Sequence, residues 1–274
     1  MQDVTTYRAS ERGARIQQAW RDLSEGFRRR ALWLGLGWLE IKQRYRRSVI
    51  GPFWLTISVA LFVGGLGVMY AQIFNTETRD YLPFLAVGFI VWTMLSTLAL
   101  EGCSVFISSE AIIKQLPVPI TAHVFRLIWR NLIIFAHNMI VYVLVMVYFG
   151  LNPGWVAFLA LPGLFLLCCF GFGVALLFGM TSARYRDIPP TIGSIIQIVF
   201  FLTPIMWKPE TLPERSAVVD WNPVHYLIEV IRAPLLGEAP PWSDWLVATA
   251  IAAASLVIAF LFFVRFRGRI AYWL

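Results

Sequence analysis

The stretch IKQRYRRSVIGPFW, residues 41–54, combines a cluster of cations with the start of an apolar run. Its basic residues are Lys42, Arg44, Arg46 and Arg47, and by Trp54 the chain is already apolar. Lys and Arg are in excess on the cytoplasmic flanks of membrane spans. The stretch therefore predicts that a first transmembrane helix begins here from the cytoplasmic side, with Pro52 in its first turn, where no amide donor is needed.

The composition of the whole chain supports this interpretation. Of its 274 residues, 58% are hydrophobic and 14% are charged, whereas a soluble domain carries about 25% charged residues. The net charge is +7, and because the cations cluster beside apolar runs we expect anionic lipid headgroups, and no nucleic acid, as their partners. The three cysteines all lie in apolar runs, so no disulfide framework is predicted.

We expect an all-α integral membrane protein with six transmembrane helices, because a span needs ~20 mostly apolar residues. The expected spans are Phe53–Phe74, Leu82–Ile107, Leu127–Phe149, Trp155–Met180, Thr191–Trp207 and Trp245–Val264. The fifth is short and open to another interpretation. The transmembrane domain would cover residues 51–264, followed by a tail of residues 265–274.

The distribution of basic residues tests this count. With the N-terminus inside, the cytoplasmic pieces hold 11 Lys and Arg in residues 1–52, 3 in 108–130, 2 in 181–190 and 3 in 265–274, which is 19 of 23. Six spans with both termini in the cytoplasm therefore satisfy the positive-inside rule. No cleavable signal peptide is expected, since the first fifty residues are polar and rich in arginine.

Residues 28–50 mix cations with large apolar side chains, a pattern typical of a helix that lies in the cytoplasmic membrane interface. The cations are Arg28, Arg29, Arg30, Lys42, Arg44, Arg46 and Arg47. The simpler alternative is that these residues are only a positively charged flank. Residues 1–27 are interpreted only as a cytoplasmic N-terminal segment.

The outer segment from Lys208 to Asp244 contains an apolar stretch interrupted by His225, Glu229 and Arg232. The spacings i,i+4 and i,i+3 place these three on one helical face, where they can pair. The stretch is too short for a span, and its ionisable groups are costly in lipid. We expect a helical hairpin that enters the outer half of the bundle; the alternative is an amphipathic helix on the outer leaflet.

The inner loop SSEAIIKQLPVPI, residues 108–120, predicts a short helix that Ser108 or Ser109 caps and that two prolines end. Glu110 and Lys114 form an i,i+4 pair. An apolar ridge would project from this helix toward a partner groove. The ridge residues are Ile112, Ile113 and Leu116.

Four stretches together resemble the permease subunits of ABC-2-type exporters, especially those that move O-antigen and related surface polysaccharides. They are IKQRYRRSVIGPFWLTIS, AIIKQLPVPI, RYRDIPPTIGSIIQIVFFLTPIMW and WNPVHYLIEVIRAPLLG. The resemblance covers the chain from about residue 30 to its end. Capsule, teichoic-acid and small-molecule exporters share the same plan.

The resemblance implies a homodimeric channel in the bacterial inner membrane, with two copies of a separate ATPase subunit docked below and an undecaprenyl-linked glycan as substrate. The coupling helix would be residues 109–117 and the outer gate residues 209–240. Gate candidates are Trp221, His225, Tyr226, Glu229 and Arg232. A phosphate-binding Walker loop needs Gly followed by Lys and then Ser or Thr, and no lysine here follows a glycine. The partner ATPase would therefore bind ATP and Mg, and this chain would be a non-catalytic subunit without a cofactor.

Ionisable groups inside spans are candidates for function. For Glu101 and Arg130, an inter-helix pair and a pore role are equally plausible; His137 is more often a packing residue than a proton relay. Tyr70, Trp92 and Tyr142 are weak candidates for lining a pore. The histidines lack the spacing of metal ligands. The competing functions are a proton-coupled secondary transporter, for which internal repeats are not evident, and an enzyme acting on lipid-linked sugars, for which clustered carboxylates are missing.

Overall fold

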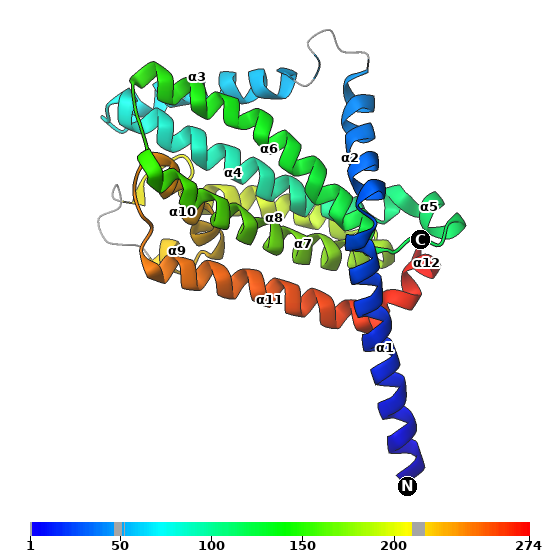
Figure 1. Cartoon of the computed structure of the whole chain (residues 1–274). Helices are drawn as coiled ribbons and strands as arrows, with labels where there is room; N and C mark the ends of the chain where they lie inside the picture. Colours follow the sequence, from blue (N-terminus) through cyan, green and yellow to red (C-terminus); the bar gives the residue numbers. More distant parts are fainter. Residues whose placement is uncertain (1, 47–50, 52, 210–216) are drawn as a thin grey trace.

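The computed structural model describes residues 2–46, 51, 53–209 and 217–274 (Figure 1). Arg47, Pro52 and residues 210–216 of the expected gate lie outside this part of the chain. All regular structure in the described residues is helical, which confirms the all-α part of the predicted fold class. The helices are α1 Gln2–Arg28, α2 Arg30–Tyr45, α3 Phe53–Ile73, α4 Thr78–Ser104, η1 Ile107–Ser109, α5 Glu110–Gln115, α6 Thr121–Phe149, η2 Gly154–Leu159, α7 Ala160–Arg184, α8 Ile188–Leu202, α9 Ala217–Asp220, α10 Pro223–Leu236, α11 Trp242–Phe266, η4 Arg267–Arg269 and α12 Ile270–Trp273.

Within the described residues, five helical segments are long and apolar enough to cross a membrane. They contain α3, α4, α6, α7 and α11, and they match five of the six expected spans. The remaining one, the expected fifth span, contains α8, which has 15 residues. At 1.5 Å per residue this helix is about 22 Å long, which is shorter than the ~30 Å hydrocarbon layer. The second span begins at Thr78 instead of Leu82, with Pro83 inside the helix.

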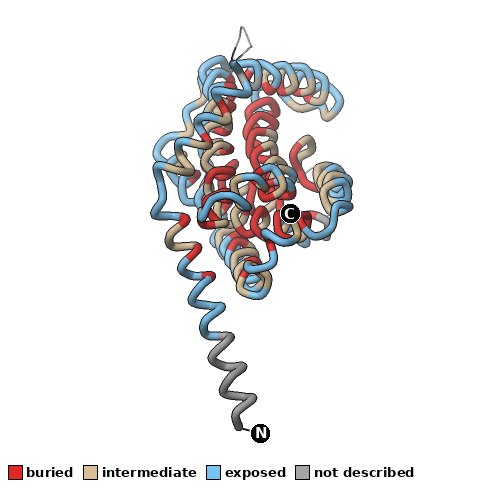
Figure 2. The backbone as a smooth tube through the Cα atoms, turned by 90° about the vertical axis from the view of Figure 1, so that its right-hand side faces the viewer, coloured by how far each residue is buried: buried red, intermediate tan, exposed pale blue. Residues whose placement is uncertain are grey.

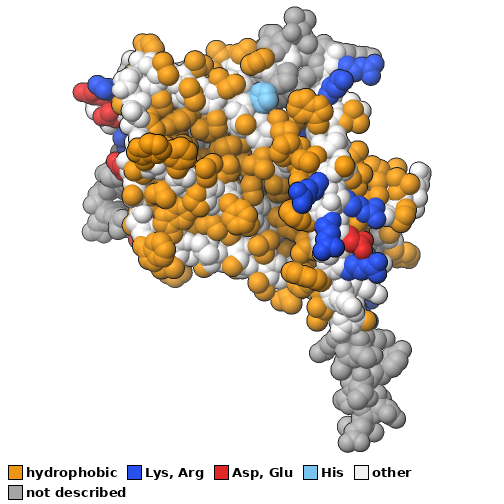
Figure 3. Space-filling model, viewed as in Figure 1, with side chains coloured by type: hydrophobic (Ala, Val, Ile, Leu, Met, Phe, Trp, Pro, Cys, Tyr) orange, Lys and Arg blue, Asp and Glu red, His pale blue; other side chains and the backbone are white. Residues whose placement is uncertain are grey.

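Helix α4 is at the centre of the bundle. In its most apolar window 72% of the residues are buried, against 22–33% in the other four segments. Helices α3, α6, α7, α8 and α10 pack around it, and the buried residues follow the inner sides of the helices (Figure 2). The face of the bundle seen in Figure 3 is covered with hydrophobic side chains, as a lipid environment requires.

Small residues bring the helices into close contact within one chain. A Cβ atom on Gly102 of α4 would lie 2.8 Å from the Cα of Ala175 on α7, and one on Gly173 would lie 2.7 Å from the backbone of Ser255 on α11. Close approach of this kind is typical of membrane helices. Small residues of α7 and α11 therefore pack against each other inside the subunit.

Helices α1 and α2 run across the direction of the spans at one end of the bundle (Figure 1). The helix α5 and the C-terminal helix α12 lie at the same end, which we call the basic end because Lys and Arg side chains gather there (Figure 3). Helices α1 and α2 are separated at Arg29. The expected interface helix of residues 28–50 therefore begins at Arg30 as α2, and the segment before it forms a separate helix, α1. The crossing orientation agrees with an interfacial position of α2.

Candidate functional site

Helix α2 lies on α6 through a small residue. A Cβ atom on Gly37 would be 2.9 Å from the Trp129 ring and 3.3 Å from the carbonyl oxygen of Arg126, so only glycine allows this approach. Ile41, one turn further, is buried. The contact turns Glu40, which lies between them, toward the arginines of α6.

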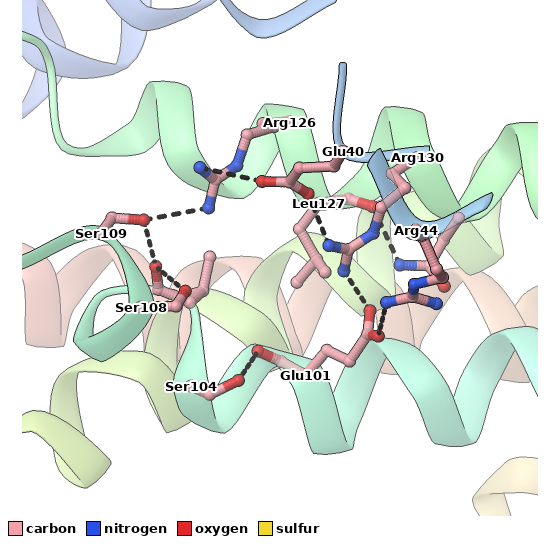
Figure 4. A network of polar contacts seen from close by, with 11 residues as sticks. Glu40, Arg44, Glu101, Ser104, Ser108, Ser109, Arg126, Leu127 and Arg130 are labelled. Carbon is pink, nitrogen blue, oxygen red and sulfur yellow. Dashed lines mark hydrogen bonds and ion pairs between the residues drawn. The ribbon is translucent and has the colours of Figure 1, made fainter. Parts of the chain in front are cut away.

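Five charged side chains from α2, α4 and α6 form one ion-pair network at the basic end (Figure 4). Glu40 of α2 accepts from Arg126 Nη1 at 3.1 Å and from Arg130 Nη1 at 2.5 Å. The other branch of Arg130 bonds to Glu101 of α4. Glu101 also accepts from Arg44 Nη2 at 3.2 Å. Each carboxylate therefore bridges two arginines, and three helices are joined.

The network places its most buried charges next to their partners. The side chains of Arg126 and Arg130 are 9% and 13% exposed, and an unpaired charge at such a position costs several kcal/mol. Glu40 and Glu101 offset two of the three positive charges. The inter-helix pair between Glu101 and Arg130 is therefore present, and Arg126 pairs with Glu40.

The same network reaches α5 through Ser109. Arg126 Nη2 donates to Ser109 Oγ at 2.9 Å, and Ser109 Oγ donates to the carbonyl of Val105 at 2.8 Å. The expected capping role of this serine was wrong, since no side-chain cap hydrogen bond is formed. The hydroxyl instead fixes the base of α5 to α6.

Helix α5 itself is short and mostly exposed. Lys114 bonds to Glu110 at 2.7 Å as its spacing predicts, and this hydrogen bond lowers the pKa of Glu110. The helix ends at Gln115, before the two prolines. The apolar ridge is less prominent than expected: Leu116 is 55% exposed, but Ile113 packs against the main core.

Asp22 attaches α1 to the basic end. Its buried carboxylate accepts from the backbone amides of Ile120 at 3.3 Å and Thr121 at 3.1 Å, and from Arg267 Nε at 2.8 Å. It thereby joins α1, the start of α6 and η4. Neither Asp22 nor Glu40 was singled out in the sequence; the only signal is an isolated acid in an arginine-rich segment.

At the opposite end, α10 contains the expected gate residues. Asn222 caps it by accepting from the amide of Val224 at 3.0 Å, and the helix ends at Gly237 with φ of 92°. The helix packs against α4, α7 and α11. It follows the single turn of α9; residues 210–216 lie outside the described part.

The expected pair between Glu229 and Arg232 is present, with Arg232 Nε 3.0 Å from the carboxylate. Arg232 is 1% exposed, donates to the carbonyl of Pro204 at 2.6 Å, and lies 4.0 Å above the ring of Phe84 on α4. It thus connects α10 to α4 and to the segment after α8. Of the other gate candidates, Trp221 is 86% exposed, and the ring of His225 is 5.3 Å from that of Tyr226.

The remaining candidates make contacts within this chain. Trp92 is buried against Phe200, and Tyr142 is buried and donates to the carbonyl of Leu235 at 2.7 Å. Neither therefore lines an open path within the subunit. Tyr70 stacks on Phe74. His137 lies with Nδ1 2.8 Å from the carbonyl of Ile133 on its own helix.

The fold and the site together define a class: a multi-spanning helical membrane protein with an ion-paired end to which its terminal helices and α5 converge. Among the described residues, no three His, Cys, Asp or Glu side chains are grouped as a metal site. Residues 32–236 match the family model described as ABC-2 type transporter. Because this match covers more than half of the chain, the protein belongs to the ABC-2 type transporter family.

Curated relatives point in the same direction. The chain is 24% identical over 192 residues, 69% of this chain and 74% of the relative, to an O-antigen export system permease protein of Klebsiella pneumoniae. It is 22% identical over 241 residues, 85% of this chain and 90% of the relative, to a protein of the same name from Myxococcus xanthus. The protein is therefore similar to export permeases over most of its length.

Proposed function

We propose that this chain is the membrane subunit of an ATP-driven exporter that moves a lipid-linked surface polysaccharide of the O-antigen type from the cytoplasm to the periplasm. It would act in the bacterial inner membrane as a homodimer, with both termini in the cytoplasm. Two copies of a separate ATPase subunit would bind ATP and Mg. The observation that carries the proposal is the family membership together with the names of the relatives.

The basic end supports the coupling part of this proposal. An ATPase that binds below the membrane would contact α5, where Leu116 is exposed next to the Glu110–Lys114 pair. Because Arg126 holds Ser109 at the base of α5 and Glu40 on α2, a displacement of α5 would be transmitted to the interface helix and the spans. The region around residues 109–117 would thus be the coupling element.

The opposite end supports the export part. Helix α10 packs against the spans and is held by Arg232, which supports a role for it in closing a path on the outer side. Export would require this helix, or its counterpart in a second subunit, to move. Capsule, teichoic-acid and small-molecule substrates remain alternatives for the cargo. Proton coupling is less favoured, because Glu101 is held by two arginines and His137 by its own helix.

The test is transport in proteoliposomes that contain this chain, alone and with a candidate ATPase subunit of an ABC exporter. We expect an undecaprenyl-linked glycan to become accessible on the far side of the membrane only when both chains and ATP are present. Leu116→Asp should reduce transport and ATPase stimulation together, whereas Trp155→Asp, an exposed change at the opposite end, should not alter ATPase stimulation. ATP-independent transport that collapses with the proton gradient would contradict the proposal.

A further inference from the structure

A second cationic feature lies at the basic end, apart from the ion-pair network. We call it the arginine pocket: a cavity of about 480 Å³ between α1, the end of α11 and η4. It is lined by Arg15, Gln18, Val264, Arg265, Arg267, Gly268 and Arg269. Segments from opposite ends of the sequence therefore converge on it. Among the described residues that line the cavity, every charged one is an arginine.

The pocket is organised before any ligand arrives. Asp22, whose side chain is fully buried, holds Nε of Arg267 at 2.8 Å. The carboxylate is itself fixed by the amide and hydroxyl of Thr121, at 3.1 and 2.9 Å. The guanidinium of Arg267 thus has a defined orientation, which reduces the entropy lost on binding. Glu25, a neighbouring acid on α1, is bound to Arg21 at 2.7 Å.

The charge of the pocket indicates the chemistry of its ligand. Four arginines line the cavity, and Asp22 is bound to one of them. The lining therefore keeps an excess of positive charge, which an anion placed among the guanidinium groups would offset. Arginine presents its donors as a planar fork that matches the oxygen atoms of phosphate and binds them in pairs. A phosphate group therefore fits the pocket better than an uncharged or cationic ligand.

The position of the pocket relative to the membrane indicates the source of the phosphate. Helix α11 is long and apolar enough to span a membrane, and its last turn contains Arg265. Because three arginines at the end of this helix and in η4 are costly in hydrocarbon, we expect the pocket to lie where the hydrocarbon layer ends, at the level of the headgroups. On α1, Trp20 is 63% exposed and lies 6.1 Å from the ring of Phe260 on α11, as expected for an aromatic residue at a membrane boundary.

We propose that the arginine pocket binds the phosphate of an anionic phospholipid headgroup and that this lipid joins α1 to the end of α11. Basic pockets at the ends of transmembrane helices are suited to such headgroups. The proposal rests on the membrane placement of α11 and not on any transported substrate. The proposal is tested by lipid binding, whereas the export function is tested by transport. Either of the two can therefore fail while the other holds.

Gly268 offers a matched pair of variants. A Cβ atom there meets no other atom within 4 Å, and Gly268 does not have a positive φ, so a side chain can be added without strain. Gly268→Glu places a carboxylate in the pocket, whereas Gly268→Gln adds an uncharged side chain of the same size. One added negative charge offsets one arginine, and at ~1 kcal/mol per basic residue this weakens binding about fivefold.

The experiment is native mass spectrometry of the full chain in detergent, titrated with phosphatidylglycerol. We expect the unaltered protein and Gly268→Gln to retain one tightly bound lipid, and Gly268→Glu to bind it at least about fivefold more weakly. Arg265→Gln with Arg269→Gln is a second variant, expected to lose about 25-fold from two such charges, and it carries the test if Gly268→Glu does not fold.

Three outcomes would overturn the proposal. Equal affinity for phosphatidylglycerol in all variants would show that the lipid binds elsewhere. Equal binding of phosphatidylcholine would show that the anionic charge is not recognised. Displacement of phosphatidylglycerol by millimolar inorganic phosphate would identify a site for a soluble anion instead of a lipid.

Discussion

Removal of Arg232 tests the buried connection between α10 and the spans. In Arg232→Met the apolar part of the side chain is kept, but the carboxylate of Glu229 and the carbonyl of Pro204 lose their donor. The side chain of Glu229 is 23% exposed, so part of the lost interaction is replaced by water. Breaking a buried pair by removing one partner costs ~3–5 kcal/mol, and we expect about 3 kcal/mol here.

A loss of about 3 kcal/mol corresponds to a shift of more than 100-fold in the unfolding equilibrium. It would be measured as reversible unfolding of the purified chain in mixed micelles. Arg232→Lys keeps the charge but not the planar guanidinium group, so its free energy of unfolding should lie between those of the unaltered protein and Arg232→Met. Adding Glu229→Gln to Arg232→Met removes the stranded carboxylate and should recover part of the loss. A stability of Arg232→Met within 0.5 kcal/mol of the unaltered protein would refute the reasoning.

Three further predictions concern packing and the basic end. Gly173→Ala should lower the free energy of unfolding by ~1–3 kcal/mol, because its Cβ would lie 2.7 Å from the backbone of α11. The control is Gly35→Ala, whose new Cβ would meet no atom within 4 Å, and it should be neutral or stabilising in the same unfolding assay. Glu101→Gln and Arg130→Gln should show a coupling free energy of ~0.5–3 kcal/mol in a double-mutant cycle, and additive effects would mean that their ion pair contributes nothing. Asp22→Asn should loosen α1, seen as faster amide exchange over residues 13–28, and unchanged exchange would contradict the anchoring role of this carboxylate.

The long apolar helices were predictable from sequence because length and hydropathy alone set a membrane span. The first, second, third, fourth and last spans were located to within about six residues at each end. The ends of α10 were not predicted, although Asn222 and Gly237, which cap it, are typical capping residues. The helix α8 was harder to assign because its apolar run continues to Trp207, whereas the helix ends at Leu202. Hydropathy does not report where a helix stops inside an apolar run.

The partners of the buried charges were not predictable in the same way. Glu40 bonds to Arg130, 90 positions away, and Asp22 to Arg267, 245 positions away. Such pairs depend on how helices cross, and spacing within one helix carries no signal for them. The i,i+3 and i,i+4 pairs Glu229–Arg232 and Glu110–Lys114 were correct because both members lie on one helix.

The central claim is that energy enters this protein from another chain through α5. The most direct test is photo-crosslinking with a benzoylphenylalanine residue at position 116, beside α5, or at position 155, where the exposed Trp155 lies at the opposite end of the bundle. The account predicts that the purified ATPase subunit is captured from position 116 and not from position 155. Capture from position 155 alone, or from neither position in a complex that hydrolyses ATP, would contradict it.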